Sequence, residues 1–322
     1  MKKILFVLLI AFVCSCKSNK SKSVLDDKVV EKPKISQEAI KASMEYLASD
    51  ELQGRATGTE GIEKAAVFIE KYLELNGIKP YFKTYRDSFK LNDLDAYNIV
   101  GVIEGNDPKL KNEYIILGGH YDHIGFGNVV EGDSIANGAN DDASGTIAAM
   151  EFGKYFAKTK SNKRSILITL YTAEELGLKG SEHLAARLKK EGIDAYTMIN
   201  FEMIGVPRAK SETMAYISGF EKSNFATKLN EYGNEEVVGF FDKAKEMQLF
   251  RRSDNYPFYQ ELGIPAQAIS TFDFTNFDYY HHVYDEADKM NYEHMVTFIE
   301  KMIPALEGLM NAPTKEVILK DE

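Results

Sequence analysis

Three apolar, strand-like runs in this chain each end in residues whose side chains bind metal ions. Residues 165–171 are β-branched and apolar, as in a buried strand, and Glu174 and Glu175 follow them. The other two runs precede His120 and Glu202. Imidazole and carboxylate donors without cysteine suit zinc and similar divalent ions. Because binding sites of open α/β sheets form at the carboxyl ends of the strands, the pattern predicts a metal site at one sheet edge.

Helical patterns separate these runs. Apolar spacing and capping residues predict six helices, at about 36–48, 57–75, 143–156, 181–190, 225–232 and 295–306. Strands are predicted at 97–103, 114–117, 165–171, 196–201, 214–218 and 264–269. The alternation predicts an α/β fold, a single domain with a central, mostly parallel mixed sheet covered by helices on both faces. We place this catalytic domain at residues 36–318.

The first sixteen residues have the pattern of an export signal. Lys2 and Lys3 are followed by the apolar core 4–13, which is too short to span a membrane as a mature helix. The ending Val13-Cys14-Ser15-Cys16 resembles a bacterial lipobox, and Cys16 is the better candidate for acylation because Val13 is a poor small residue before Cys14. An ordinary secretory signal cut nearby is the alternative.

Both alternatives predict an exported protein. We expect a signal peptide over 1–16, a flexible tether over 17–35, and a lipid anchor at Cys16 facing the periplasm or in the outer membrane. The lipid would be the only membrane contact. If Cys16 carries it, no internal disulfide can form.

The formal net charge of −10 argues against nucleic acid as a partner, because no basic stripe is present to neutralise phosphates. An acidic site would suit a substrate that carries a cationic amine. A solvated acidic surface is the commoner explanation of such a charge.

Five short clusters carry a resemblance to a known family. They lie at 118–122, 138–142, 173–177, 200–205 and 280–282, and the segments 52–58 and 253–258 add to them. In this order they resemble the bacterial zinc aminopeptidase family with two co-catalytic metals, a metallopeptidase family that also includes glutaminyl cyclases and glutamate carboxypeptidases. The resemblance extends from about residue 47 to residue 289.

The resemblance implies two divalent metal ions, zinc first among the candidates, with cobalt and manganese as alternatives. By resemblance His120 and Glu202 bind one ion, Glu175 and His281 bind the other, and Asp141 bridges both. Many relatives place Asp where this chain has Glu202. The carboxylate is retained, but the added methylene can change the metal spacing.

His282 is the rival of His281, although a histidine four residues before an acidic residue, here Asp285, is the family pattern. Asp142 is better explained as the cap of the following helix than as a ligand. His123 is a possible pocket residue to which no role is assigned.

Catalytic roles also follow from the resemblance. Glu174 would act as the general base, since the attacking water must lose a proton and the leaving amine must gain one. Asp122 would accept the second ring N–H of His120 and so fix the imidazole. Tyr280 would stabilise the oxyanion, with simple packing as the equal alternative.

The resemblance therefore implies a metal-dependent exopeptidase, first of all an aminopeptidase that cleaves N-terminal residues from peptides with a free N-terminus. The attacking water would be shared by the two metals. A glutaminyl cyclase-like enzyme with one zinc is one alternative, and a non-catalytic lipoprotein that retains the fold is another. The complete set of ligands, with Glu174, favours the hydrolase.

Overall fold

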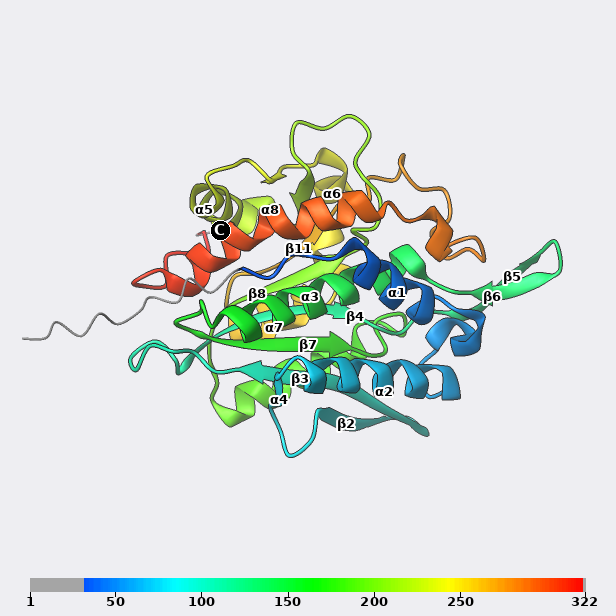
Figure 1. Cartoon of the computed structure of the whole chain (residues 1–322), viewed down its shortest axis with the longest axis horizontal. Helices are drawn as coiled ribbons and strands as arrows, with labels where there is room; N and C mark the ends of the chain where they lie inside the picture. The colour runs from blue at the N-terminus through cyan, green and yellow to red at the C-terminus, as the bar shows by residue number, and fades with distance from the viewer. Residues whose placement is uncertain (1–31, 321–322) are drawn as a thin grey trace, which may run out of the picture. The chain divides into compact units, whose positions relative to one another are not determined.

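The computed structural model describes residues 32–320 (Figure 1). The predicted signal peptide, Cys16 and most of the predicted tether lie outside these residues and stay predictions. The tether prediction overlaps the described part at 32–35, where Ile35 is buried and the Lys32 ammonium lies 2.8 Å from the Glu307 carboxylate. Among residues 32–320, no helix is both long and apolar enough to cross a bilayer.

Helices and strands alternate along most of the described chain. The helices are α1 (Gln37–Leu47), α2 (Glu60–Leu75), α3 (Ser144–Thr159), α4 (Lys179–Glu191), α5 (Phe225–Gly233), α6 (Asp242–Glu246), α7 (Asn255–Leu262) and α8 (Tyr292–Asn311). The strands are β1 (Lys79–Pro80), β2 (Arg86–Leu91), β3 (Leu94–Ile103), β4 (Glu113–His120), β5 (Gly125–Val130), β6 (Asp133–Ala136), β7 (Ser165–Tyr171), β8 (Asp194–Glu202), β9 (Ala215–Ile217), β10 (Val238–Gly239) and β11 (Ala266–Ser270).

Within residues 32–320, nine of these strands form one mixed sheet in the order β1-β3-β7-β4-β8-β11-β9-β10, with β2 paired to β3. The central strands β7, β4, β8 and β11 are parallel to one another. The flanking pairs β3–β7 and β9–β11 are antiparallel. The predicted α/β class with a mixed sheet is confirmed, and its parallel part is the centre.

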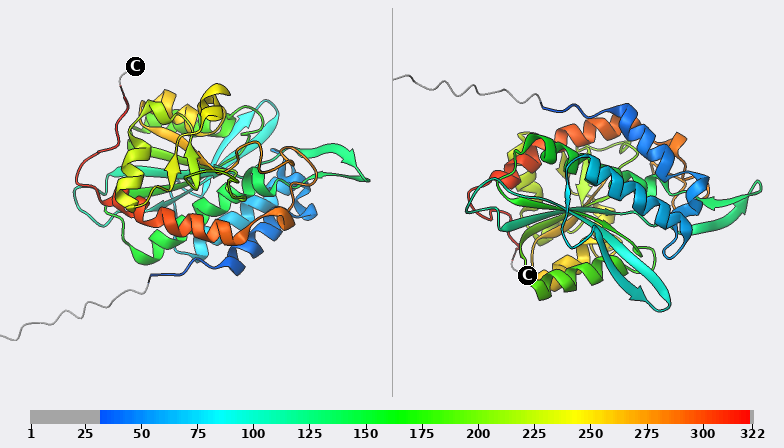
Figure 2. Two further views of the ribbon diagram at one scale, coloured as in Figure 1. Left: turned by 90° about the horizontal axis from the view of Figure 1, so that it is seen from above. Right: turned by 60° about the horizontal axis from the view of Figure 1, so that its bottom comes forward.

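Helices cover both faces of the sheet (Figure 2). Successive residues of a strand point to opposite faces, so Ile115 and Leu117 of β4 pack with apolar residues of α1, α2, α3 and α8. Ile116, between them, packs on the other side with residues of α4 and α7. Burial on both faces explains why the central strands are continuously apolar.

The carboxyl ends of the central strands meet at one edge, as predicted. In the parallel register His120 of β4 pairs with Tyr171 of β7, and Gly118 pairs with Asn200 of β8. The chain therefore leaves β4, β7 and β8 at neighbouring points, and the residues that follow these strands lie close together.

Several elements were not predicted from the sequence. They include the short strands β1 and β10, the strand β2, the projecting hairpin β5–β6 and the helices α6 and α7 (Figure 1). Only one residue in each of β2, β5 and β6 is buried and the others are partly buried or exposed, so none of these strands contains the apolar run that indicates a buried strand. The predicted helices were found, with boundaries that differ by a few residues.

Candidate metal and catalytic centre

A buried arginine holds the loops of the site together. Arg55 ends the turn Asp50–Arg55, and its guanidinium donates to the backbone carbonyls of Leu47, Tyr121, Asn137 and Gly138 at 2.5–2.9 Å. Two of these carbonyls lie just before Asp141, and that of Tyr121 follows His120. Burial lowers the pKa of Arg55, and the negative charge of Asp285 opposes that shift. The segment 52–58, noted above only for its resemblance, thus has a structural role.

Asp285 fixes the loop that carries Asp141. Its carboxylate accepts the backbone N–H groups of Asn140 at 2.7 Å and Asp141 at 3.0 Å. Burial raises the pKa of Asp285 to about 8. Asp285 entered the prediction only as a spacing marker for His281, whereas the structure shows that it orients a different candidate ligand.

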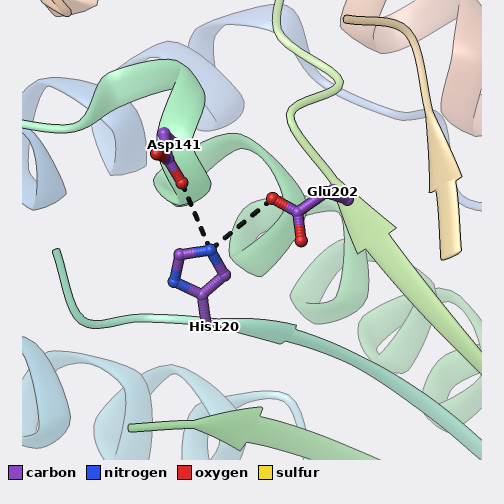
Figure 3. A group of neighbouring side chains, drawn as sticks. All are labelled: His120, Asp141 and Glu202. Carbon is purple, nitrogen blue, oxygen red and sulfur yellow. Dashed lines mark ion pairs between the residues drawn. The ribbon is translucent and has the colours of Figure 1, made fainter. Parts of the chain in front are cut away.

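The first candidate metal group consists of His120, Asp141 and Glu202 (Figure 3). Nε2 of His120 lies 3.2 Å from Oδ1 of Asp141 and 3.6 Å from Oε1 of Glu202. Burial lowers the pKa of His120, but the negative charges around the ring, that of Glu174 foremost, outweigh it and raise the pKa well above its usual range. A cation, either a proton or a metal ion, is therefore favoured at this position.

Glu202 is tightly held despite its additional methylene. Its Oε2 accepts the Ser253 hydroxyl at 2.5 Å and the Asn200 amide at 3.3 Å, while Oε1 faces His120. Ser253 lies two residues before α7, in the segment 253–258 that carries part of the resemblance. The longer side chain thus reaches the group with one oxygen and is anchored by the other.

Asp122 differs from its prediction in one detail. The Nδ1 of His120 lies 3.1 Å from the backbone carbonyl of Asp122, whereas the Asp122 carboxylate is 3.6 Å away. The carboxylate instead accepts the backbone N–H groups of Glu174 at 3.2 Å and Glu175 at 3.4 Å. Asp122 therefore orients the His120 imidazole mainly through its backbone carbonyl, and its carboxylate positions Glu174 and Glu175.

The second candidate group surrounds Asp141 and Glu175. Nε2 of His281 lies 3.2 Å from Oδ2 of Asp141 and 3.0 Å from Oε2 of Glu175. Nδ1 of His282 accepts the backbone N–H of Tyr284 at 3.0 Å. The structure thus brings His281, rather than its rival, to the carboxylates. His123, which had no assigned role, lies here as well, with Nδ1 3.0 Å from Oε1 of Glu175.

The electrostatics of Asp141 and Glu175 suit ligands. Burial alone would raise the pKa of Asp141, but its contacts with His120 and His281 hold the pKa far below the usual range. Burial likewise opposes ionisation of Glu175, and its contacts with His123 and His281 lower its pKa. Both groups are therefore carboxylates at neutral pH, the form that coordinates a metal.

The residues of the second group fit a metal ion. Within residues 32–320, four of their buried atoms form no hydrogen bond of acceptable geometry, although imidazole and carboxylate atoms lie close together: Nδ1 and Nε2 of His123, Oδ2 of Asp141 and Oε1 of Glu175. Buried polar atoms are nearly always paired, so such a cluster of unpaired nitrogen and oxygen atoms needs a missing partner. Nitrogen and carboxylate oxygen together are a common zinc ligand set.

Glu174 lies beside both groups at the end of β7. The turn that carries it includes Ala173, whose φ of 56° lies in the left-handed region, and Thr57 accepts the Ala173 N–H at 3.0 Å. Burial raises the pKa of Glu174 well above its usual range, and the negative charge of Asp254 adds to the effect. A carboxylate that binds a proton readily is suited to acid–base catalysis.

Asp142 accepts backbone hydrogen bonds from segments that carry candidate ligands. Its Oδ1 accepts the N–H of Gly145 at 3.1 Å, three residues further on, and the N–H of Met203 at 2.9 Å. Its Oδ2 accepts the N–H of His120 at 3.2 Å. The contact with Gly145 has the spacing of the predicted helix cap, and the other two tie β4 and β8 to the same carboxylate.

Tyr280 lies at the mouth of the site and is 49% exposed. Its ring stacks on His281 with 4.0 Å between ring centroids, and on Phe272 at 5.9 Å. Partial burial raises the pKa of its hydroxyl, and the negative charge of Asp141 adds to the effect, so the hydroxyl stays protonated. Packing is evident, and the predicted oxyanion role stays a prediction.

A cavity of about 210 Å³ opens beside Glu202 and Tyr280. Most of its remaining lining is apolar or small, with one arginine: Met203, Tyr216, Ser218, Met247, Leu249, Arg252, Ser253, Ala268, Ser270, Phe272 and Phe274. It can therefore hold an apolar side chain next to the candidate metal ligands.

Sequence reasoning left two buried residues of the site without a role. His123 stands three residues after His120, and this His-x-x-His spacing behind a strand is the signal that could have identified it. Asp254 is fully buried, and burial raises its pKa to about 7. It follows Ser253 in the segment that carries part of the resemblance, but no spacing rule connects it to Glu174.

Helices on both sides of a mixed sheet, with imidazoles and carboxylates gathered at its carboxyl edge, define the class of zinc-exopeptidase-like α/β domains. Residues 98–306 match the model of Peptidase family M28. The chain therefore belongs to this family, which confirms the predicted family membership.

Individual relatives agree with this assignment. A probable zinc metalloprotease of Pyrenophora tritici-repentis is 35% identical over 115 residues, which are 36% of this chain and 26% of that protein. The matched part is thus a minor share of that relative's length. A solved zinc aminopeptidase of Bacillus subtilis has a TM-score of 0.69 at 15% identity, with 90% of this chain and 99% of that chain covered.

A third similar protein has a different described activity. The structure of Tannerella forsythia glutaminyl cyclase has a TM-score of 0.66 at 18% identity, covering 85% of this chain and 99% of that chain. At such identities the two structural likenesses establish the fold alone.

Proposed function

We propose that this protein is a metal-dependent exopeptidase, an aminopeptidase that works with two zinc ions. The observation that carries the proposal is the position of Asp141 between the two candidate groups. Its Oδ1 faces His120, and its Oδ2 faces His281. One carboxylate oriented toward two imidazoles on opposite sides is the arrangement expected of a bridging ligand.

In this proposal His120, Asp141 and Glu202 hold one ion, and Asp141, Glu175 and His281 hold the other. Bound zinc would supply Lewis acidity for the scissile carbonyl and would lower the pKa of the attacking water. Glu174 accepts the proton of the water and passes it to the departing amine. Its raised pKa supports this role, because the carboxyl must hold the proton between the two transfers.

Substrate selection would depend on the carboxylates at the edge of the site. Glu174 and Glu202 offer negative charge to the free α-amine of a peptide, and the adjacent apolar cavity would take the side chain of its first residue. The Tyr280 hydroxyl, protonated at neutral pH, would donate to the developing oxyanion.

The first test combines metal analysis with activity measurements on wild type and Glu174→Gln. The wild type should bind two zinc ions and hydrolyse amino-acid anilides, with the highest rates for apolar residues. Glu174→Gln should keep both metals and lose about 10²–10⁴-fold in turnover, the usual contribution of a general acid–base group. Glu182→Gln, an exposed glutamate on α4, is the matched control.

Three outcomes would contradict the proposal. An active Glu174→Gln variant would remove the base assignment. One zinc per chain, with cyclisation of glutaminyl peptides, would favour the glutaminyl cyclase alternative, whose fold is equally similar. A protein that binds zinc but acts on neither substrate class would favour the non-catalytic alternative.

The proposal includes export and a lipid anchor at Cys16, supported by the lipobox-like ending Val13-Cys14-Ser15-Cys16. Cys16→Ser should move the protein from the membrane fraction to the soluble fraction and abolish incorporation of labelled lipid. Cys14→Ser is the control and should change neither. Equal behaviour of the two variants would exclude Cys16 as the lipid site.

A further inference from the structure

His123 is held rigidly at the inner side of the site. It lies three residues beyond the end of β4 and is 1% exposed, and its backbone N–H donates to the Arg55 carbonyl at 3.3 Å. The imidazole packs against Gly138, where an added Cβ would lie 2.5 Å from the ring. Gly138 also has a φ of 60°, so both its space and its conformation favour glycine. The ring therefore packs directly against the backbone of Gly138.

That position directs Nδ1 at two carboxylates. Nδ1 lies 3.0 Å from Oε1 of Glu175 and 3.8 Å from Oδ2 of Asp141. Despite these short distances, none of the three atoms forms a hydrogen bond of acceptable geometry within residues 32–320. Ligand atoms at about 2.0–2.2 Å from a common zinc ion lie roughly 3–4 Å from one another, so the spacing is that of a shared cation.

His281 approaches the same carboxylates from the solvent side. Its side chain is 36% exposed, and its ring centroid is 5.6 Å from that of His123, with 72° between the ring planes. His281 faces Oε2 of Glu175, whereas His123 faces Oε1. The two imidazoles thus flank Glu175 and do not compete for one oxygen.

Another buried histidine shows that burial alone does not explain these contacts. His294 of α8 is 8% exposed and its Nε2 also lacks a partner, but burial is the only cause of its pKa shift, which is downward to about 4. Within the part of the chain that the structure describes, His294 forms no ion pair with a carboxylate, whereas His123 faces Glu175 and Asp141. A buried histidine that only packs is therefore expected to look like His294.

We propose that His123 is a ligand of the metal ion held by Asp141 and Glu175. The inference rests on the proposed metal-dependent function and extends it. With His281, this ion has four side-chain ligands, two of them imidazoles, whereas the ion at His120, Asp141 and Glu202 has three. The ion beside His123 accordingly binds more tightly and is loaded first.

The test compares zinc affinities by competition with a chelator in wild type, His123→Gln and His294→Gln. Glutamine keeps a hydrogen-bond donor for Glu175 but is a poor zinc ligand. The tighter wild-type site should weaken in His123→Gln by at least about tenfold, the lower end of the effect of removing even an outer partner of a metal ligand. His294→Gln should leave both affinities unchanged.

A second measurement needs no variant. X-ray absorption at the zinc edge of the fully loaded wild type counts imidazoles, and the proposal requires three shared between two ions instead of two. Thermal unfolding of the metal-free variants shows whether each is folded before its affinity is interpreted.

The proposal is overturned by a two-imidazole count or by unchanged zinc affinity in folded His123→Gln, which would make His123 a hydrogen-bond donor to Glu175. Failure of the wild type to bind any zinc would overturn the proposed function itself, and so the two failures are distinguishable.

Discussion

The two halves of the candidate centre share Asp141 but are organised differently. In the Glu202 half, formed by His120, Glu202 and Oδ1 of Asp141, Glu202 is anchored by hydrogen bonds to Ser253 and Asn200 and borders the cavity. In the Glu175 half, formed by His123, His281, Glu175 and Oδ2 of Asp141, several buried atoms have no partner within the described chain.

The difference indicates separate tasks. A carboxylate held by neutral donors keeps its position when its metal or substrate partner changes, as a substrate-facing ligand must. Unpaired buried polar atoms are costly unless a cation joins them, so the Glu175 half gains most from a bound metal. We therefore expect the Glu175 half to be the metal-retaining side and the Glu202 half to be the substrate-facing side.

The largest expected effect comes from Asp141→Asn, because this change alters both halves at once. Loss of the shared negative charge should lower zinc affinity at both positions by at least about 100-fold, more than is typical for outer-shell changes. Equilibrium dialysis with metal analysis measures it. Asp95→Asn, an exposed aspartate paired with Lys90, serves as the control. Loss of only one metal would show that Asp141 does not bridge.

Arg55→Ala should destabilise the loops that carry the ligands of both halves. Four carbonyls would lose a buried donor, and each unpaired buried group costs about 1–3 kcal/mol, so we expect at least about 3 kcal/mol of lost stability. Denaturant unfolding of the metal-free protein measures this. The partly stacked surface residue Arg251 provides the control Arg251→Ala, which should change stability little. Equal stability of the two variants would contradict the role of Arg55.

Ser253→Ala should affect the Glu202 half of the centre and leave the Glu175 half unchanged. It removes the hydroxyl that anchors Glu202 and touches nothing in the Glu175 half. We expect about tenfold weaker binding of one zinc ion, the more weakly held one, and no change at the other. Chelator competition resolves the two sites, and Ser211→Ala on an exposed loop is the control. Weakening of the tighter site would reverse the assignment of the halves.

The smallest expected effect is a shift in the pH dependence of activity. Glu174 must be ionised to act as a base, and burial raises its pKa, with a further upward contribution from Asp254. Activity should therefore be lost as the pH falls through this raised pKa. Asp254→Asn removes a negative charge, lowers the pKa and should move the acid limb of kcat/KM to lower pH, by at most about one unit. An acid limb that stays in place or moves upward would contradict this.

Much of the fold follows from local pattern. Residues 165–171 were predicted as a strand at the observed boundaries, since an unbroken β-branched run has few other stable structures. The hairpin Gly125–Ala136 and helix α7 were not predicted from the sequence. Their sequences are polar or short, and they are defined by contacts with distant segments.

In the candidate site, too, some features follow from local sequence pattern and others depend on contacts with distant segments. Strand ends predicted that His120, Glu174, Glu175 and Glu202 would meet. In the structure His120, Glu175 and Glu202 lie around Asp141, and the charge of Glu174 acts on His120. Two details could not be predicted. The ring Nδ1 of His120 meets the backbone carbonyl of Asp122, and His123 turns toward Glu175.

By itself, then, the sequence determined the type of sheet, the order of the metal-binding residues and the family, because periodicity and strand ends act over short distances along the chain. Only the tertiary structure decided which atoms of those residues meet. Side-chain direction in the loops depends on Arg55 and Asp285, which act on segments more than sixty residues away through buried hydrogen bonds. Such bonds are strong because water is excluded, and no local sequence pattern indicates them.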